Sequence, residues 1–476
     1  MFDIIENLVI PISPDSSESE YNTRLVTKIC NDLNINLTKE SCIVSIEERL
    51  NLSVESAHTF QIKNKLQQKS NINILQKLLE KVVENREKLA KLESIFAKKN
   101  IIDSLNEVDI FVDHLKYAIY LLSKHKNIEI NTEGVYTTKQ IYEPVGVVSM
   151  IVPYNFPLVV VAERLPYALA AGCSVIIKPS EVSSGCLPLL VKIATDIGFK
   201  SGNISIIHGN AKISEKMVAD DRIDFVSFTG STEVGRKIAI SCANTFKRTS
   251  LELGGNNFAF IDINSNLEVA AAHVAKGYLY HSGQCCISTR VVLVHNNIYD
   301  EFILKLKHAI GKYIEGNDIR ELCDSKNFNI VKNSYNKYCS NYEIIDTCTN
   351  NYKIVNNFII PTVFKSRNDY PDEEIFGPLL RTQIVMDYES AISIINKSEY
   401  GLALQIFSSS NSIVSEIISR THVGRIWVNG SLVNFPKMRI SGFHLSGNSS
   451  IGGSNALKDY MVTKAVIEDS TIKYME

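Results

Sequence analysis

The first third of the chain shows two different periodicities of apolar and polar residues. Residues 57–99 space their apolar side chains three and four apart, which predicts one or two long amphipathic helices whose charged residues face solvent. The same spacing predicts a helix at about 105–124. Residues 127–145 alternate instead around a turn at 133–134, which predicts a β-hairpin. The first 60 residues are polar, with only short β-leaning runs.

From residue 145 onward, short apolar runs alternate with helical patterns. Strands are expected at 147–152, 174–177, 204–207 and 225–228, and helices at 158–171, 185–197, 213–218 and 233–241. This alternation predicts an α/β fold with a doubly wound parallel sheet, whose ligands bind at the carboxyl ends of the strands. A second α/β segment is expected from about residue 254 to the C-terminus.

Composition narrows the class of protein. The chain has 476 residues, 45% of them apolar and 21% charged, which is typical of a globular protein with two or three domains. A net charge of −2 provides no attraction to nucleic acid or to anionic membranes. The most apolar long window, 158–177, carries Glu163 and Arg164 near its middle, and a membrane span would not accept that pair.

The ten cysteines are scattered and include no CxxC pair, so neither a disulfide framework nor a metal site is predicted. The N-terminal residues are acidic where a signal peptide is basic. We therefore expect a cytoplasmic protein with no membrane or nucleic-acid partner.

Two adjacent cysteines, Cys285 and Cys286, follow Gly-Gln between a predicted helix at 267–280 and an apolar run at 291–294. A thiol at such a boundary can meet a substrate while the flanking elements hold it in place, which suits a nucleophile. The alternative is a pair of ordinary buried thiols, because free cysteine packs like a small apolar residue.

Residues 228–235 (FTGSTEVG) follow a strand and open a helix, which is an arrangement that can bind a phosphate or pyrophosphate. The stretch is not the GxGxxG fingerprint. Residues 236–238 (RKI) replace the Lys-Ser/Thr of a phosphate-binding loop, which disfavours a nucleoside triphosphatase. Alternatively, Gly230 makes a tight turn and Ser231 caps the helix.

Further polar residues lie at other strand ends. Lys178 and Glu181 could grip the hydroxyls of a ribose or form a surface ion pair. Asn155 lies between two prolines, which fix the backbone around it. Its amide could donate a hydrogen bond to an anion, or it could form an Asx turn. Glu252 is flanked by apolar residues and glycines. It could serve as a general base, or it could form an ion pair with a Lys or Arg. A second acidic motif occupies 373–378.

Taken together and in order, five motifs resemble those of the aldehyde dehydrogenase superfamily. They are PYNFP (153–157), KPSE (178–181), FTGSTEVG (228–235), LELGG (251–255) followed by GQCC (283–286), and EEIFGP (373–378). The resemblance covers nearly the whole chain from about residue 57. It implies NAD(P)-dependent, hydrolytic oxidation of an aldehyde to a carboxylic acid.

The resemblance also implies a division of the chain. A dinucleotide-binding domain would comprise 1–125 and 145–253, a catalytic domain 254–445, and a small β oligomerisation element the hairpin 126–144 with the tail 457–476. A homodimer or homotetramer is therefore expected.

By the same resemblance, Cys286 would be the nucleophile, Asn155 and the backbone N–H of Cys286 the oxyanion hole, and Glu252 the base that activates water. The cofactor would contact Lys178, Glu181, Gly230, Ser231, Leu253, Gly254, Glu374 and Phe376. Glu181 slightly favours NAD because a carboxylate beside the ribose repels a 2′-phosphate, while Lys178 leaves NADP open.

Residues near the substrate tunnel, again by resemblance, would be Tyr154, Glu163, Arg164, His281 and Cys285. Their polarity suggests a small hydroxy-aldehyde of the glyceraldehyde or lactaldehyde type, or a semialdehyde. A CoA-acylating relative is disfavoured because Glu252 supplies a water-activating base. A catalytically silent relative acting as a binding protein is the other alternative.

One departure concerns which cysteine attacks. Members of this superfamily usually place an arginine five residues after the nucleophile, whereas Arg290 lies five after Cys285 and four after Cys286. The separation from Glu252 favours Cys286.

Overall fold

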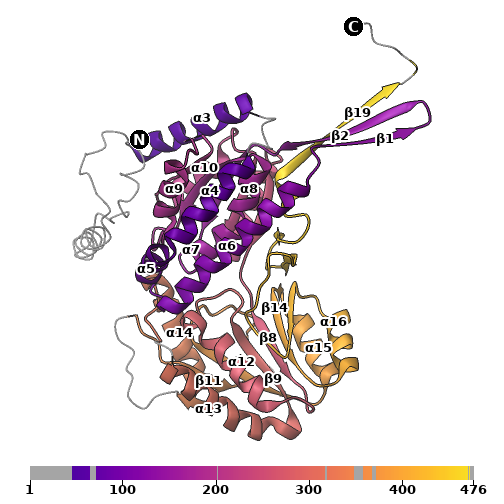
Figure 1. Cartoon of the computed structure of the whole chain (residues 1–476). Helices are drawn as coiled ribbons and strands as arrows, with labels where there is room; N and C mark the ends of the chain where they lie inside the picture. Colours follow the sequence, from indigo (N-terminus) through magenta and orange to yellow (C-terminus); the bar gives the residue numbers. More distant parts are fainter. Residues whose placement is uncertain are drawn as a thin grey trace.

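The computed structural model describes residues 45–64, 71–200, 202–316, 319–347, 357–366, 371–469 and 471. In this part of the chain, two α/β units lie one above the other, and a slender ribbon of β1, β2 and β19 extends from the upper one (Figure 1). The predicted α/β fold class is confirmed. No helix within the described residues combines the length and apolarity needed to cross a membrane.

The upper unit contains a parallel sheet in the order β5-β4-β3-β6-β7. Its strands are β3 (Val147–Val152), β4 (Ser174–Pro179), β5 (Ile204–Ile206), β6 (Phe225–Thr229) and β7 (Arg248–Glu252). The runs of Val, Ile and Phe in β3, β4 and β6 are buried throughout, as expected for a sheet covered on both faces. The strand order reverses direction beside β3, so the loops after β3 and β6 meet at a ligand-binding edge.

Helices α3 (Ile46–Asn64), α4 (Asn71–Glu84), α5 (Arg86–Phe96) and α6 (Ile101–Lys124) precede the sheet. Leu75 of α4 and Phe111 of α6 join Val148 in the core on one face, while Val54 of α3 joins Val147 on the other. The prediction of β-leaning structure before residue 60 is wrong over α3. This helix buries only the narrow stripe of Leu50, Val54, Ala57 and Gln61, so its periodicity was weak.

The other helices of this unit are α7 (Pro157–Ala162), α8 (Leu165–Ala171), α9 (Leu187–Asp196), α10 (Ala211–Ala219) and α11 (Thr232–Ala243). The single helix predicted at 158–171 is wrong, because α7 ends before Glu163 and α8 begins after Arg164. Pro166 has no N–H to bond the carbonyl of residue 162, and its ring would clash there, so it interrupts the helix.

The lower unit contains a sheet in the order β10-β11-β12-β9-β8-β14-β15, parallel except for β10. Its strands are β8 (Asn257–Ile261), β9 (Thr289–His295), β10 (Glu343–Thr347), β11 (Thr362–Lys365), β12 (Leu379–Val385), β14 (Ala403–Phe407) and β15 (Arg425–Val428). Its helices are α12 (Leu267–Leu279), α13 (Tyr299–Gly316), α14 (Ser325–Asn341), α15 (Tyr388–Lys397) and α16 (Asn411–Arg420).

Short elements complete the described chain. They are β13 (Tyr400–Gly401), β16 (Ile440–Ser441), β17 (Phe443–His444), β18 (Ser450–Ile451), and the 3₁₀ turns η2 (Tyr280–Gly283), η3 (Asn296–Ile298) and η4 (Lys458–Tyr460).

The predicted hairpin is confirmed as β1 (Ile128–Glu133) and β2 (Tyr136–Pro144). Strand β19 (Met461–Asp469) pairs antiparallel with β2, so segments more than 300 residues apart form one ribbon. Ile130 and Ile467 expose 60% and 70% of their surface on this ribbon, which has apolar area available for another surface.

Candidate active site

The cysteine stretch follows α12 through an unusually sharp turn. His281 and Ser282 both adopt left-handed backbone conformations, with φ of 49° and 55°, and Gly283 follows with φ of 74°. A Cβ added to Gly283 would lie 2.4 Å from the carbonyl oxygen of Gly377. The turn therefore needs glycine at position 283, and it brings the cysteines close to the 373–378 motif.

Side chains from two neighbouring strands hold this loop. Arg290 of β9 donates from Nη2 to the carbonyl oxygens of Gly283 at 2.7 Å and Cys285 at 3.1 Å. Asn257 of β8 donates from Nδ2 to the carbonyl oxygen of Cys286 at 2.7 Å. The cysteines are therefore fixed by hydrogen bonds on both sides.

The two thiols differ in exposure and in acidity. Cys285 is 5% exposed, whereas Cys286 is more exposed. A hydrogen bond between the two sulfurs lowers the pKa of Cys285 and, together with burial, raises the pKa of Cys286 well above its ordinary value. Of the two sulfurs, a substrate meets that of Cys286 more readily.

Asn155, in the loop after β3, reaches this stretch directly. Its side chain is 6% exposed and donates from Nδ2 to the carbonyl oxygen of Gln284 at 2.8 Å. The structure therefore brings PYNFP and GQCC together, although they lie 129 residues apart in sequence.

Glu252, the last residue of β7, lies in a buried group of charges. Arg164 Nη2 contacts Glu252 Oε2 at 2.7 Å and donates to Thr229 Oγ1 at 3.0 Å. Glu163 Oε1 accepts from Asn434 Nδ2 at 3.0 Å, and burial followed by the Glu252 charge raises the pKa of Glu163 to about 7. The break between α7 and α8 places Glu163 and Arg164 here, so Glu252 has the arginine partner that its sequence context left open.

Lys178, at the end of β4, is a buried cation without a partner. It is 5% exposed, burial lowers its pKa, and it forms no hydrogen bond or ion pair with any described residue. Glu181 is exposed three residues later. Ser231 caps α11 by accepting from Val234 N at 3.4 Å, which agrees with the capping interpretation.

Two glycines let side chains approach the start of α11. A Cβ on Gly230 would lie 2.5 Å from the Phe228 ring, and one on Gly235 would lie 2.4 Å from Leu253. The loop after β6 is therefore packed closely against the end of β7.

Glu374 and Phe376 approach the same edge from the other unit. Glu374 accepts from Gly255 N at 3.1 Å, and a Cβ on Gly254 would lie 2.3 Å from its Oε2. The ring of Phe376 lies 6.3 Å from that of Tyr154 in an edge-on arrangement. The five motifs thus converge where the two units meet.

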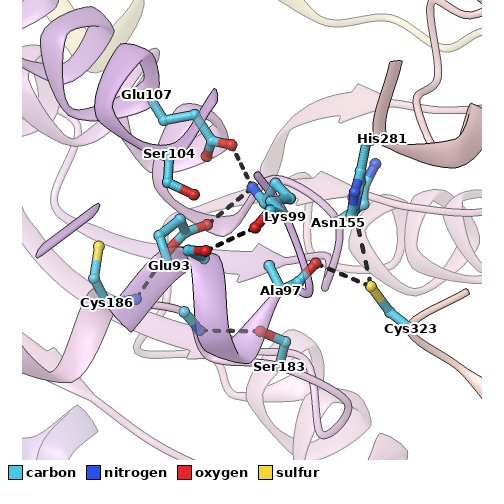
Figure 2. Close-up of polar contacts among 12 residues, drawn as sticks. Glu93, Ala97, Lys99, Ser104, Glu107, Asn155, Ser183, Cys186, His281 and Cys323 are labelled. Carbon is cyan, nitrogen blue, oxygen red and sulfur yellow. Dashed lines mark hydrogen bonds and ion pairs between the residues drawn. The ribbon is translucent and has the colours of Figure 1, made fainter. Parts of the chain in front are cut away.

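Lys99, Glu93 and Glu107 form a buried ion triad beside the PYNFP loop (Figure 2). The Lys99 ammonium contacts Glu107 and, at 3.1 Å, Glu93, and it lies 4.4 Å from the centre of the Phe156 ring. The expectation that charges in this region face solvent is therefore wrong for these three residues. Glu93 lies four residues after the buried Leu89, on the apolar stripe of α5, which was an available signal.

His281 is buried beside this triad. Its Nε2 lies 3.8 Å from Cys323 Sγ, its ring packs edge-on against Phe156 at 5.3 Å, and burial followed by the Lys99 charge lowers its pKa well below the ordinary value (Figure 2). The neutral ring supports the turn that carries the cysteines.

The five residues expected near a substrate tunnel occupy two places. Glu163 and Arg164 line a cavity of about 220 Å³, which the other three do not line. Of those three, His281 and Cys285 lie in the turn and loop that carry Cys286, and Tyr154 packs against Phe376.

Comparison with known proteins shows the family of the chain. The family model described as "Aldehyde dehydrogenase family" matches residues 44–466. The chain belongs to the aldehyde dehydrogenase family. It is 29% identical to the putative aldehyde dehydrogenase DhaS of Bacillus subtilis over 83% of this chain and 82% of that protein.

Solved structures of the family are similar throughout. The chain matches the crystal structure of an NAD-dependent aldehyde dehydrogenase from Sinorhizobium meliloti with a TM-score of 0.84 and 27% identity, over 90% of this chain and 88% of that one. It matches betaine aldehyde dehydrogenase from Staphylococcus aureus in complex with NAD+ with a TM-score of 0.83 and 26% identity, over 90% and 89%.

Proposed function

We propose that this enzyme oxidises a small hydroxy-aldehyde or a semialdehyde to the acid through a covalent intermediate on Cys286. As a family member the chain is an NAD(P)-dependent oxidoreductase acting on aldehydes. The observation that carries the proposal is the contact of Asn155 with the loop that bears Cys286. Glu252 is buried, and its charge adds to the rise in the pKa of Cys286 that the Cys285 hydrogen bond and burial cause.

The Cys286 thiol loses its proton to solvent, and the thiolate attacks the aldehyde carbonyl, so that a C–S bond forms and the carbonyl oxygen becomes an anion. The Asn155 amide has a second N–H besides the one given to Gln284, and it can stabilise this anion with the backbone N–H of Cys286. Each such donor contributes about 3–4 kcal/mol. NAD, when bound, supplies the acceptor for the hydride that leaves the former carbonyl carbon.

Hydrolysis of the resulting thioester needs a base. Glu252 takes a proton from the attacking water, and the Cys286 thiolate leaves as the acid forms. Arg164 holds the Glu252 carboxylate in one orientation through their contact at 2.7 Å. We assign these roles to Cys286, Asn155 and Glu252, with Arg164 as a positioning residue.

The residues at the sheet edge fit a dinucleotide. A buried ammonium without a partner is costly, and ribose hydroxyls would satisfy Lys178. Ser231 opens the twelve-residue helix α11, whose N–H groups favour a phosphate. We assign cofactor binding to Lys178, Glu181, Gly230, Ser231, Leu253, Gly254, Glu374 and Phe376, and NAD over NADP because of Glu181.

Two further proposals concern assembly and location. We propose a homodimer or homotetramer formed through the β1–β2–β19 ribbon, supported by its exposed isoleucines. We also propose a cytoplasmic location, supported by the free thiols of the described cysteines.

The test is absorbance of the reduced nicotinamide with glyceraldehyde, lactaldehyde, 4-oxobutanoate and a long-chain aldehyde, with and without CoA. The proposal expects turnover without CoA on at least one of the first three substrates. Activity confined to the long-chain aldehyde would refute the substrate class. A requirement for CoA would establish the acylating alternative, and no turnover at all would leave a silent binding protein.

A further inference from the structure

Arg425 opens β15 on the same sheet edge as the cysteine loop. It pairs with Ala403 in the neighbouring strand β14, and Ala403 N donates to Asn257 Oδ1 at 3.0 Å. Asn257 in turn holds the carbonyl of Cys286 at 2.7 Å. A short chain of backbone and side-chain contacts thus joins Arg425 to the nucleophile loop.

Arg425 differs from the other arginines around the site in forming no hydrogen bond or ion pair with a described residue. Arg164, Arg290 and Arg381 are almost fully buried, and each donates hydrogen bonds to described residues. Arg425 is half-buried and donates to none of them, although its Nε is shielded from solvent. Its guanidinium lies over the ring of Trp427, 5.7 Å from the ring centre. A shielded donor without an acceptor costs free energy that an anion would recover.

The charge of Arg425 acts on both thiols of the cysteine pair. The hydrogen bond that Cys286 shares with Cys285 raises the pKa of Cys286, as does burial, and Arg425 opposes that rise. The pKa of Cys285 is lowered by its hydrogen bond with Cys286, then by a backbone hydrogen bond and by the charge of Arg290. The charge of Arg425 adds a smaller decrease. The positive charge of Arg425 therefore acts on the thiol that would hold a substrate, in agreement with the short chain of contacts through Ala403 and Asn257.

The charged residues around the site carry an excess of positive charge when Glu163 is protonated. Burial and the charge of Glu252 raise the pKa of Glu163 to about 7, against the opposing charges of Arg164 and Arg425. Near neutral pH, part of the Glu163 population is therefore uncharged. In that state the Glu252 carboxylate, which contacts Arg164, balances only one of the two guanidinium charges that act on Glu163.

We propose that Arg425 binds a carboxylate of the substrate, so that this enzyme selects short oxo-acids over neutral and cationic aldehydes. The inference rests on the proposed function and narrows its two substrate classes to the semialdehyde. A guanidinium presents two parallel N–H donors that match a carboxylate. A trimethylammonium group, as in betaine aldehyde, would meet a like charge at the same place.

The test compares three small aldehydes that differ in charge: 4-oxobutanoate, butanal and betaine aldehyde. Arg425→Gln is expected to lower kcat/KM for 4-oxobutanoate by about 100-fold, chiefly through KM, because a close charge pair is lost. The change for butanal should stay below about threefold, and activity on betaine aldehyde should not fall. Arg425→Lys keeps the charge without the two-pronged geometry and should give an intermediate loss on 4-oxobutanoate.

Arg420→Gln is the matched control, because Arg420 pairs with Glu389 on the exposed side of α16 and should leave all three activities unchanged. An equal loss on 4-oxobutanoate and butanal in Arg425→Gln would overturn the proposal, since Arg425 would then serve the thiol or the fold. Unchanged activity on 4-oxobutanoate would also overturn it.

A binding measurement separates this inference from the proposed function. Succinate should slow alkylation of Cys286 by iodoacetamide in the wild type and not in Arg425→Gln. If no aldehyde is oxidised, the proposed function fails, while this difference still supports Arg425 as a carboxylate site. Equal protection, or none, in both proteins refutes the site.

Discussion

Lys99 lies fully buried between two carboxylates, so its replacement by methionine tests what the triad contributes to stability. Lys99→Met keeps the chain length but leaves Glu93 and Glu107 without their cation. Removing one partner of a buried ion pair costs about 3–5 kcal/mol, and the lost contact with the Phe156 ring adds to this.

The effect on thermal unfolding follows from chain length. An unfolding entropy of about 2.1 cal/mol/K per residue over 476 residues gives about 1 kcal/mol/K, so the midpoint should fall by about 3–5 °C. Scanning calorimetry at one fixed scan rate measures this. Lys98→Met is the matched control: Lys98 is 40% exposed and 3.4 Å from Glu321, so its loss should cost less than about 1 kcal/mol.

The deficit should also depend on pH. Burial raises the pKa of Glu107 well above 4.5, and Lys99 opposes that rise. Without Lys99 the folded-state pKa rises further above the unfolded value, so the folded state loses more stability as pH increases from about 5 to 8. The decrease in the unfolding midpoint caused by Lys99→Met should therefore be larger at pH 8 than at pH 5.5. A midpoint within 1 °C of wild type at both values, or an equal drop in Lys98→Met, would refute the reasoning.

The remaining expectations concern the site and the assembly. Cys286→Ala should abolish nicotinamide reduction and Cys285→Ala should leave most of it, and the reverse result would move the nucleophile to Cys285. Glu181→Gln should raise the ratio of kcat/KM with NADP to that with NAD by about fivefold, since one like charge in water is worth about 1 kcal/mol; a wild type that prefers NADP strongly would contradict this. Ile130→Glu should shift the sedimenting species toward monomer, and a wild type that sediments only as monomer would end the assembly proposal.

Much of the site could be predicted because its signals are local. Each motif couples the end of an apolar strand to a short polar loop, and parallel strands bring their carboxyl ends to one edge. Asn155, Lys178 and Ser231 could therefore be expected at that edge before their contacts were known. The hairpin was equally local, since alternation over a few residues and one turn define it.

Long-range packing decided the rest. Periodicity shows that a residue faces inward but not what it faces, so the contact of Arg164 with Glu252, 88 residues away, had no sequence signal. In the sequence, Lys99 does not differ from a solvated lysine, and only the packing of two helices buries it. Arg425 lies in an ordinary strand with no motif, and only the pairing of β15 with β14 brings it toward the cysteines. Charges acquire their partners, or lack them, through tertiary contacts between segments distant in the chain, and local sequence does not encode those contacts.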